Sequence, residues 1–142
     1  MKRQTRPVLF VLLVAAGVGL VFAWPRINDV ETGKTAAYPD LKPRTYDVAP
    51  DRIYALVREI AATSPGWKLS AHGFGPGSWS VQTVRAPRPL PLTYDVHVKI
   101  TRHGSQSVVS VRSTSRWGKW DFGQNARNIR ELFGLLDEKL RG

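Results

Sequence analysis

The feature that most constrains this chain is a continuous apolar run over residues 8–24. In a helix that rises about 1.5 Å per residue, a run of this length covers about 26 Å, close to the thickness of the hydrocarbon core of a bilayer. Pro25 and a basic residue follow the run directly. Residues 1–25 therefore predict an N-terminal transmembrane anchor.

The charges around the run indicate how the segment would lie in a membrane. Lys2, Arg3 and Arg6 precede it, and cations in this position keep the adjacent terminus in the cytoplasm. We therefore expect a single-pass protein of the cell inner membrane with its C-terminal domain in the periplasm. The alternative is a cleaved signal peptide with Ala23 as the small residue at the cut, although the bulky Trp24 just beyond it disfavours cleavage.

The net positive charge of the chain indicates which classes of partner it can bind. The 142 residues include 21 Lys plus Arg and 11 Asp plus Glu, and the part that follows the apolar run still carries a net charge of about +7. A basic domain outside the cytoplasm does not meet DNA or RNA, which excludes nucleic acid. The expected partners are the membrane bilayer, an anionic lipid and a membrane protein. The sequence has no cysteine, which excludes disulfides, thiolate metal sites and a cysteine nucleophile.

Patterning after the run indicates the fold class. Residues 26–45 contain turn formers and no apolar periodicity, so they predict a linker to a folded domain over residues 46–142. Apolar stripes at helical spacing predict two helices, and alternating segments predict strands. The helices are expected over residues 50–63 and 126–140, the strands over 46–48, 67–71, 79–84, 93–101 and 107–116, and a turn over 72–77. We expect a two-layer α+β fold in which both helices pack on one face of an antiparallel sheet of about five strands.

The last two predicted strands indicate a sheet face that stays open to solvent. Lys99, Arg112 and Arg116 all fall on its polar positions. A register that places Asp95 opposite Thr114 also puts Asp95 diagonally across from both arginines. This face is a candidate surface for a phosphate group or for the acidic residues of a partner. The alternative is an ordinary solvated face, whose ion pairs contribute at most about 1 kcal/mol each.

Between the last strand and the last helix, the sequence predicts a tight corner. Asp121 and Asn125 carry side chains that accept hydrogen bonds from backbone N–H groups, and Gly123 permits a sharp turn. We expect these three residues to form a rigid, capped start of the helix. The alternative is that the helix N-terminus holds a bound anion at this corner.

The same corner carries a second candidate surface. Trp117, Lys119 and Trp120 lie close together in the sequence, and Phe122 follows them. Aromatic residues interleaved with a cation suit a membrane interface or the centre of a protein–protein interface. The alternative is that one or both tryptophans close the open end of the core.

The sequence contains no recognisable catalytic constellation. His72 and His103 fall in predicted turns, and His97 falls on the polar strand face. No His-x-x-His, Gly-x-Ser-x-Gly or phosphate-binding glycine motif is present. We therefore expect no enzyme activity, no cofactor and no metal site.

The C-terminal third resembles a known bacterial family. Residues 111–130 read VRSTSRWGKWDFGQNARNIR, an Arg-Ser-x-Ser-Arg-x-Gly strand end, then Asp-x-Gly-x-Asn, then a helix that opens with arginines and isoleucine. This pattern is similar to the signature of domain of unknown function 1499, and Asp95 with Lys99 is similar to the central strand of that family. The resemblance implies a small domain that is often exported or membrane-attached. It implies no activity, because the family has no assigned catalytic residues.

Two functions fit these observations. The first is a non-catalytic accessory domain, anchored in the membrane outside the cytoplasm, that docks on a membrane protein assembly. The alternative is a carrier or sensor that binds a lipid or another small hydrophobe between the sheet and the helices. An open apolar cavity in the core would favour the carrier. A filled core with exposed tryptophans would favour the docking domain.

Overall fold

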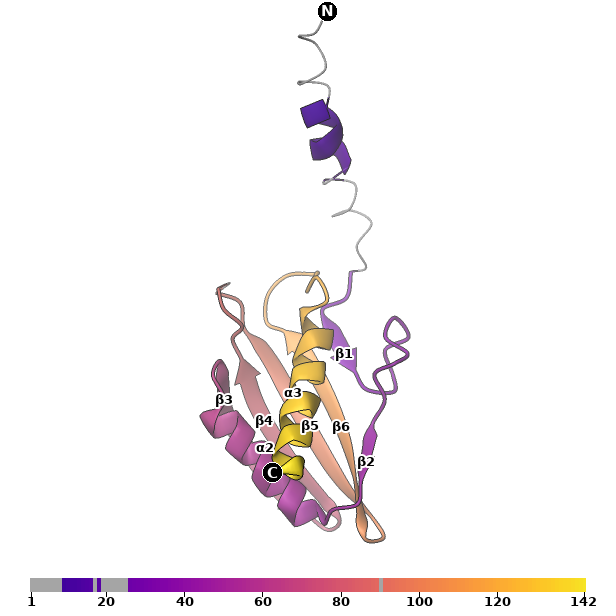
Figure 1. Cartoon of the computed structure of the whole chain (residues 1–142), viewed down its shortest axis with the longest axis vertical. Coiled ribbons are helices and arrows are strands. Elements are labelled where there is room, and N and C mark those ends of the chain that lie inside the picture. The colour runs from indigo at the N-terminus through magenta and orange to yellow at the C-terminus, as the bar shows by residue number, and fades with distance from the viewer. Residues whose placement is uncertain (1–8, 17, 19–25, 90) are drawn as a thin grey trace, which may run out of the picture.

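Figure 1 shows the computed structural model of the chain, which describes residues 9–16, 18, 26–89 and 91–142. Much of the predicted anchor over residues 1–25 lies outside these ranges, although residues 9–16 and 18 are helical. None of the described helices is both long enough and apolar enough to cross a membrane.

From Arg26 onward, the described residues form strands and helices in one sheet-and-helix domain. The elements are β1 (Asp29–Glu31), β2 (Arg44–Tyr46), α2 (Pro50–Thr63), β3 (Trp67–Gly75), β4 (Ser78–Arg85), β5 (Tyr94–His103), β6 (Gln106–Ser115) and α3 (Gln124–Arg141). The sheet is antiparallel with the order β1-β6-β5-β4-β3, and β2 also pairs with β6. The expected α+β class is confirmed, and the sheet has six strands rather than about five.

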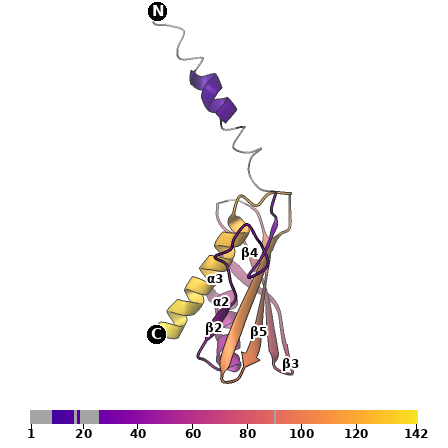
Figure 2. The same cartoon turned by 90° about the vertical axis from the view of Figure 1, so that its right-hand side faces the viewer.

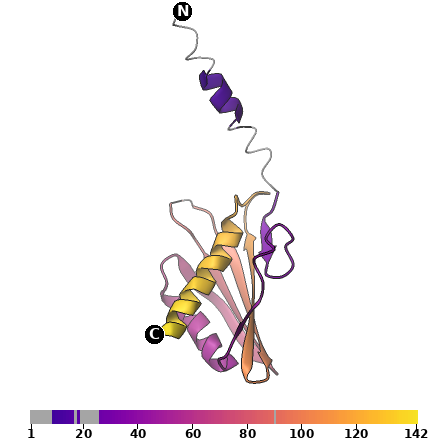
Figure 3. The same cartoon turned by 45° about the vertical axis from the view of Figure 1, so that its right-hand side comes forward.

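The additional strand comes from the segment that we expected to be a linker. β1 pairs with one half of β6, where Val30 lies opposite Ser113, and β2 pairs with the other half, where Thr45 lies opposite Val108. The intervening residues 32–43 loop away from the sheet edge and return to it (Figure 3). The linker prediction for residues 26–45 was therefore wrong, because this segment forms one edge of the sheet.

The reason for this error is visible in the burial of the segment. Val30 is 0% exposed and Leu41 is 6% exposed, and both belong to the hydrophobic core. Thr32 is also buried, and its neighbours along the chain are partly or fully exposed. Three inward-facing residues spread over twelve positions produce no helical or strand periodicity, so pattern analysis classifies the segment as a loop.

The two helices pack on the same face of the sheet (Figure 2). Pro50 is at the start of α2, where its missing N–H has no intrahelical partner to lose. The apolar stripes of both helices meet alternate residues of the central strands, and the core side chains are at most 8% exposed. The largest fully buried side chains are Phe133, Ile53, Ile60, Ile100, Ile129, Leu132 and Leu136.

The first long hairpin extends further than the sequence predicted. We expected a turn over residues 72–77, but His72 pairs with Val81 and Phe74 pairs with Trp79 within the ladder. The turn is confined to Pro76 and Gly77, and Gly77 has a φ of 67°, a backbone conformation that favours glycine. The glycines in this stretch have low strand propensity, which the cross-strand hydrogen bonds of the ladder outweigh.

Candidate functional site

The open face of the sheet is the face that the helices leave uncovered. The strand register places Asp95 opposite Thr114, as expected. Arg116 binds Asp95 through two nitrogens, with Nε 3.0 Å from Oδ2 and Nη2 2.8 Å from Oδ1. Arg112 instead binds Asp29 of β1, with its Nε 2.9 Å from Oδ1. Asp95 therefore holds only one of the two arginines, because the partner of the other comes from a strand that was not predicted.

These two ion pairs orient the arginine side chains. The hydrogen bonds from Arg112 hold the pKa of Asp29 below its ordinary value, and the same contact raises the pKa of Arg112. The hydrogen bonds to Asp95 likewise raise the pKa of Arg116. All four side chains remain more than a third exposed, so each pair contributes little to stability. Their main effect is to fix two guanidinium groups along the edge of the open face.

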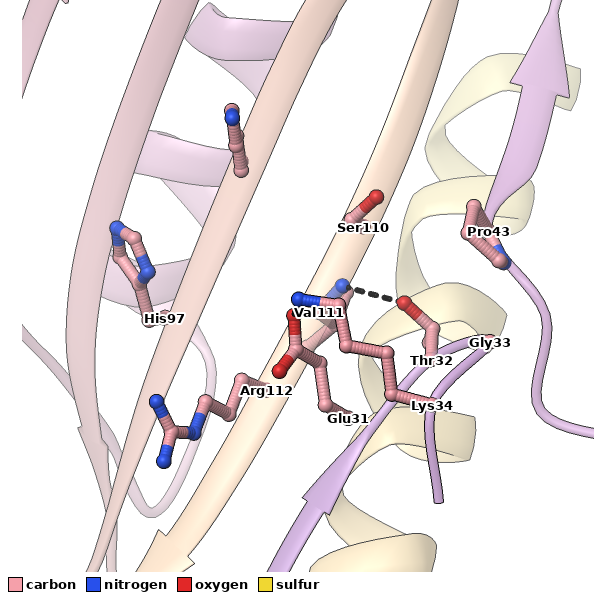
Figure 4. Close-up of a pocket in the computed structure, with 10 residues that line it drawn as sticks. Glu31, Thr32, Gly33, Lys34, Pro43, His97, Ser110, Val111 and Arg112 are labelled. Atoms are coloured by element: carbon pink, nitrogen blue, oxygen red, sulfur yellow. Dashed lines mark hydrogen bonds and ion pairs between the residues drawn. The ribbon is translucent and has the colours of Figure 1, made fainter. Parts of the chain in front are cut away.

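A cleft of about 480 Å³ lies where β1 and the loop after it meet this face. The residues that line it are Glu31, Thr32, Gly33, Lys34, Pro43, His97, Lys99, Ser110, Val111 and Arg112 (Figure 4). At the base of the cleft, the backbone N–H of Thr32 donates a hydrogen bond of 3.0 Å to the carbonyl of Val111, and the N–H of Val111 donates one of 3.0 Å to the hydroxyl of Thr32. Most of its remaining lining is polar, so the cleft suits a charged or hydrogen-bonding group rather than a hydrocarbon.

The cations in the cleft differ in how far they are already paired. Lys34 forms an ion pair of 2.7 Å with Glu31, and Arg112 is held by Asp29. Lys99 is exposed and has no ion pair with any other residue that the structure describes. Lys99 is therefore the cation of this cleft that remains available to an acidic group of a partner.

The structure places only some of the predicted candidate residues in the cleft. Lys99 and Arg112 line the cleft, whereas Arg116 directly follows β6 and lies outside the lining. Trp117, Lys119 and Trp120 lie in the loop after β6. The polar residues that β1 and the loop after it bring to the site could not be predicted from the sequence pattern: they are Asp29, Glu31, Thr32 and Lys34. The only sequence signal for them is a short polar–apolar alternation around Val30, which is too brief to identify a strand.

The corner between β6 and α3 is a network of buried hydrogen bonds. The Asp121 carboxylate, 4% exposed, accepts hydrogen bonds from the backbone N–H of Gly123 at 2.8 Å and of Asn125 at 3.0 Å. Both Phe122 and Gly123 have positive φ, 49° and 79°, so the chain reverses sharply before the helix. Asp121 thus caps α3 although it lies two residues before Gly123, which occupies the N-cap position of the helix.

Asn125 connects this cap to the end of β6. Its side chain accepts a hydrogen bond of 2.7 Å from the hydroxyl of Ser113 and donates one of 3.0 Å to the hydroxyl of Ser115. Asn128 donates a further hydrogen bond of 3.2 Å to Ser113. Ser113, Asn125 and Asn128 are all 0% exposed, so this part of the family-like pattern builds the corner and offers no surface to a ligand.

The tryptophans of the same loop have different environments. Trp117 is 74% exposed. Trp120 is partly buried, with the guanidinium of Arg26 5.4 Å from the centre of its ring. The indole N–H of Trp120 is buried and has no hydrogen-bond partner among the described residues. Trp120 is therefore partly covered, with Arg26 over its ring, whereas Trp117 faces outward.

Comparison with known families identifies the chain. A family model described as "Protein of unknown function (DUF1499)" matches residues 22–136, which include every strand and most of α3. The chain belongs to this family. The matched residues include the buried corner formed by Ser113, Asp121 and Asn125.

Other comparisons add little to this identification. A search of curated proteins gave no match to the DUF1499 chain. Among solved structures it is similar to CalU16 from Micromonospora echinospora, with 10% sequence identity, a TM-score of 0.36, and coverage of 80% of this chain and 88% of that chain. A likeness at this level supports no structural or functional argument.

Proposed function

We propose that this DUF1499 chain is a non-catalytic accessory domain, anchored in the inner membrane and located in the periplasm, that docks on a membrane protein assembly. The observation that carries the proposal is the open sheet face, where an oriented Arg112 and the unpaired Lys99 line one polar cleft. Such a surface is complementary to the acidic face of a partner protein.

The membrane anchor is supported by the apolar run and by the described part of it. In residues 9–16, the large apolar side chains of Leu9, Phe10 and Leu13 are 60–69% exposed. Exposed apolar side chains of this kind gain free energy by transfer into lipid. The basic residues that precede the run support a cytoplasmic N-terminus and a periplasmic domain.

The core supports a docking domain over a carrier of hydrophobes. A carrier needs an apolar cavity between the sheet and the helices. In the described domain, the side chains in that position are Phe133, Ile53, Ile129 and their neighbours, and each of these three is at most 1% exposed. The cleft of Figure 4 lies at the surface and is lined mainly by polar and charged residues, and it does not enter the space between the sheet and the helices.

Charge reversal on the open face tests the proposal. The full-length tagged chain is purified in mild detergent from the cells that produce it, as wild type, as Lys99→Glu and as Lys42→Glu. Lys42 is also an exposed lysine, in the loop between β1 and β2 and outside the cleft lining, so it controls for net charge. We expect Lys99→Glu to weaken association with the co-purifying membrane protein about tenfold, equal to about 1.4 kcal/mol, and Lys42→Glu to leave it unchanged. Equal recovery with both variants would contradict the proposal.

A further inference from the structure

The N-terminal segment enters the folded domain beside the loop that follows β6. The backbone carbonyl of Ile27 accepts a hydrogen bond of 3.1 Å from the N–H of Asp121, and the side chain of Asn28 donates one of 3.2 Å to the carbonyl of Gly118. Arg26 packs over the Trp120 ring. The chain is therefore attached to this loop from the first residue of the described domain.

This attachment leaves little chain between the domain and the apolar run. Arg26 follows Trp24, the last residue of that run, by two positions, a distance of at most about 7.6 Å in any trans backbone conformation. A linker over residues 26–45 would have allowed the domain to stand about 65 Å away. Because the domain begins at residue 26 instead, a membrane-inserted run holds this end of the domain at the bilayer surface.

The surface at this end is aromatic and basic. We define the end patch as Leu92, Trp117, Lys119, Trp120 and Phe122. Its apolar members include Trp117 at 74%, Phe122 at 48% and Leu92 at 37% exposure. A backbone hydrogen bond of 3.1 Å from Arg116 to Thr93 brings the loop of Leu92 next to that of Trp117. Both loops lie at the end of the sheet opposite the β5–β6 turn (Figures 1 and 3).

The charges around the end patch suit an anionic surface. Arg26, Arg88 and Lys119 are exposed. The nearby acids are engaged: Asp95 with Arg116, Asp29 with Arg112, and Asp121 within the buried corner. Each lysine or arginine close to an anionic membrane contributes about 1 kcal/mol of attraction, and tryptophan partitions preferentially into the interfacial layer.

We propose that the end patch lies in the headgroup layer of an anionic bilayer and holds the domain in a fixed orientation on the membrane. This inference rests on the membrane anchor of the proposed function. The long axes of the strands then run away from the membrane surface, and the open sheet face is directed sideways, toward a neighbouring membrane protein. Docking therefore takes place along the plane of the membrane.

Site-directed spin labelling of the full chain tests the inference, because the absence of cysteine permits single-cysteine variants. Trp117→Cys and Phe74→Cys each receive a nitroxide, and the chain is reconstituted into vesicles of phosphatidylglycerol and phosphatidylcholine. Phe74 is the matched control because it is 77% exposed and lies near the opposite end of the sheet. We expect the label at position 117 to be at least threefold more accessible to oxygen relative to a water-soluble nickel reagent than the label at position 74.

The outcomes separate failure of the inference from failure of the anchor. If the protein floats with the vesicles and both labels are equally accessible to the nickel reagent, the inference is overturned and the anchor stands. If label 117 becomes shielded from both reagents as protein density rises, it contacts a second protein copy, which also overturns the inference. If the protein does not float, the anchor and the inference are both overturned.

A second measurement keeps the native indole at position 117. Brominated phosphatidylglycerol quenches tryptophan fluorescence only at short range, so the wild-type chain in such vesicles should lose a larger fraction of its emission than Trp117→Phe. Replacing the brominated anionic lipid with brominated phosphatidylcholine at the same density should reduce this difference by at least half, which distinguishes attraction to anionic headgroups from partitioning alone. Identical quenching of the two proteins in brominated phosphatidylglycerol would overturn the inference.

Discussion

Deleting residues 1–43 should abolish cooperative unfolding of the domain, whereas deleting residues 1–25 should leave it intact. The longer deletion removes β1 with its hydrogen bonds to β6, and it removes the core residues Val30 and Leu41. Burial of each of these two side chains contributes about 1.5–3 kcal/mol, and a domain of this size has a total stability of only about 5–15 kcal/mol. Urea titration followed by circular dichroism measures the difference.

A single substitution tests the same claim without deletion. Val30→Ala should lower the free energy of unfolding by about 2 kcal/mol, because it leaves a cavity at a fully buried position. Ala37→Ser, at an exposed position of the loop between β1 and β2, is the control and should change it by less than about 0.5 kcal/mol. If Val30→Ala were as neutral as the control, residues 26–45 would be a linker after all.

Asn125→Ala should destabilise the domain by about 2–3 kcal/mol, because it removes the acceptor of the buried Ser113 hydroxyl and the donor to the partly buried Ser115 hydroxyl. The amide of Asn125 is 0% exposed and bonds both Ser113 and Ser115. Asn28→Ala is the matched control, since that amide makes one exposed hydrogen bond, to Gly118, and its loss should cost less than about 1 kcal/mol. Thermal or urea unfolding of the purified domain gives both values.

A double-mutant cycle shows whether the corner acts as one network. Ser113→Ala removes the shared hydroxyl, so the cost of Asn125→Ala should be at least 0.5 kcal/mol smaller in that background. Strict additivity of the two substitutions would show that the hydrogen bond between them contributes nothing to stability. The presence of Ser113 and Asn125 at these positions would then need an explanation other than the construction of this corner.

The parts of the fold that follow from the sequence are those with sustained periodicity. The stripe of Ile53, Val57 and Ile60 and the long alternations of β5 and β6 each repeat often enough to identify the element. The same alternation also determines which residues share the open face, so Lys99 and Arg112 could be identified as neighbours before their partners were known. The residue types of Asp121, Gly123 and Asn125 predicted the capped corner.

The parts that could not be predicted depend on contacts between distant segments. β1 and β2 are three residues each, and their pairing with β6 joins positions about 60 to 85 residues apart. No local pattern encodes such a contact, so the partner of Arg112 and half of the cleft lining were missed. The missing edge also made the chain between the apolar run and the domain look about twenty residues longer than it is.

Loss of that linker changes the functional interpretation. A domain on a long tether samples many orientations, and its docking surface must find a partner by diffusion within the reach of the tether. With the membrane anchor that we propose, a domain that begins within two residues of the apolar run would keep one end at the membrane and hold the open face close to the bilayer. Such a domain would lose less orientational freedom when it docks on a membrane protein, so the entropic cost of docking would be smaller.

The central claim is that the chain is held in the membrane with its domain outside the cytoplasm. The most direct measurement combines alkaline carbonate extraction of membranes with protease treatment of intact spheroplasts, using the full-length chain with an epitope tag after Gly142. We predict that the protein stays in the membrane pellet and that external protease removes the tag. Recovery of the protein in the soluble fraction, or a tag protected until the spheroplasts are lysed, would contradict the account.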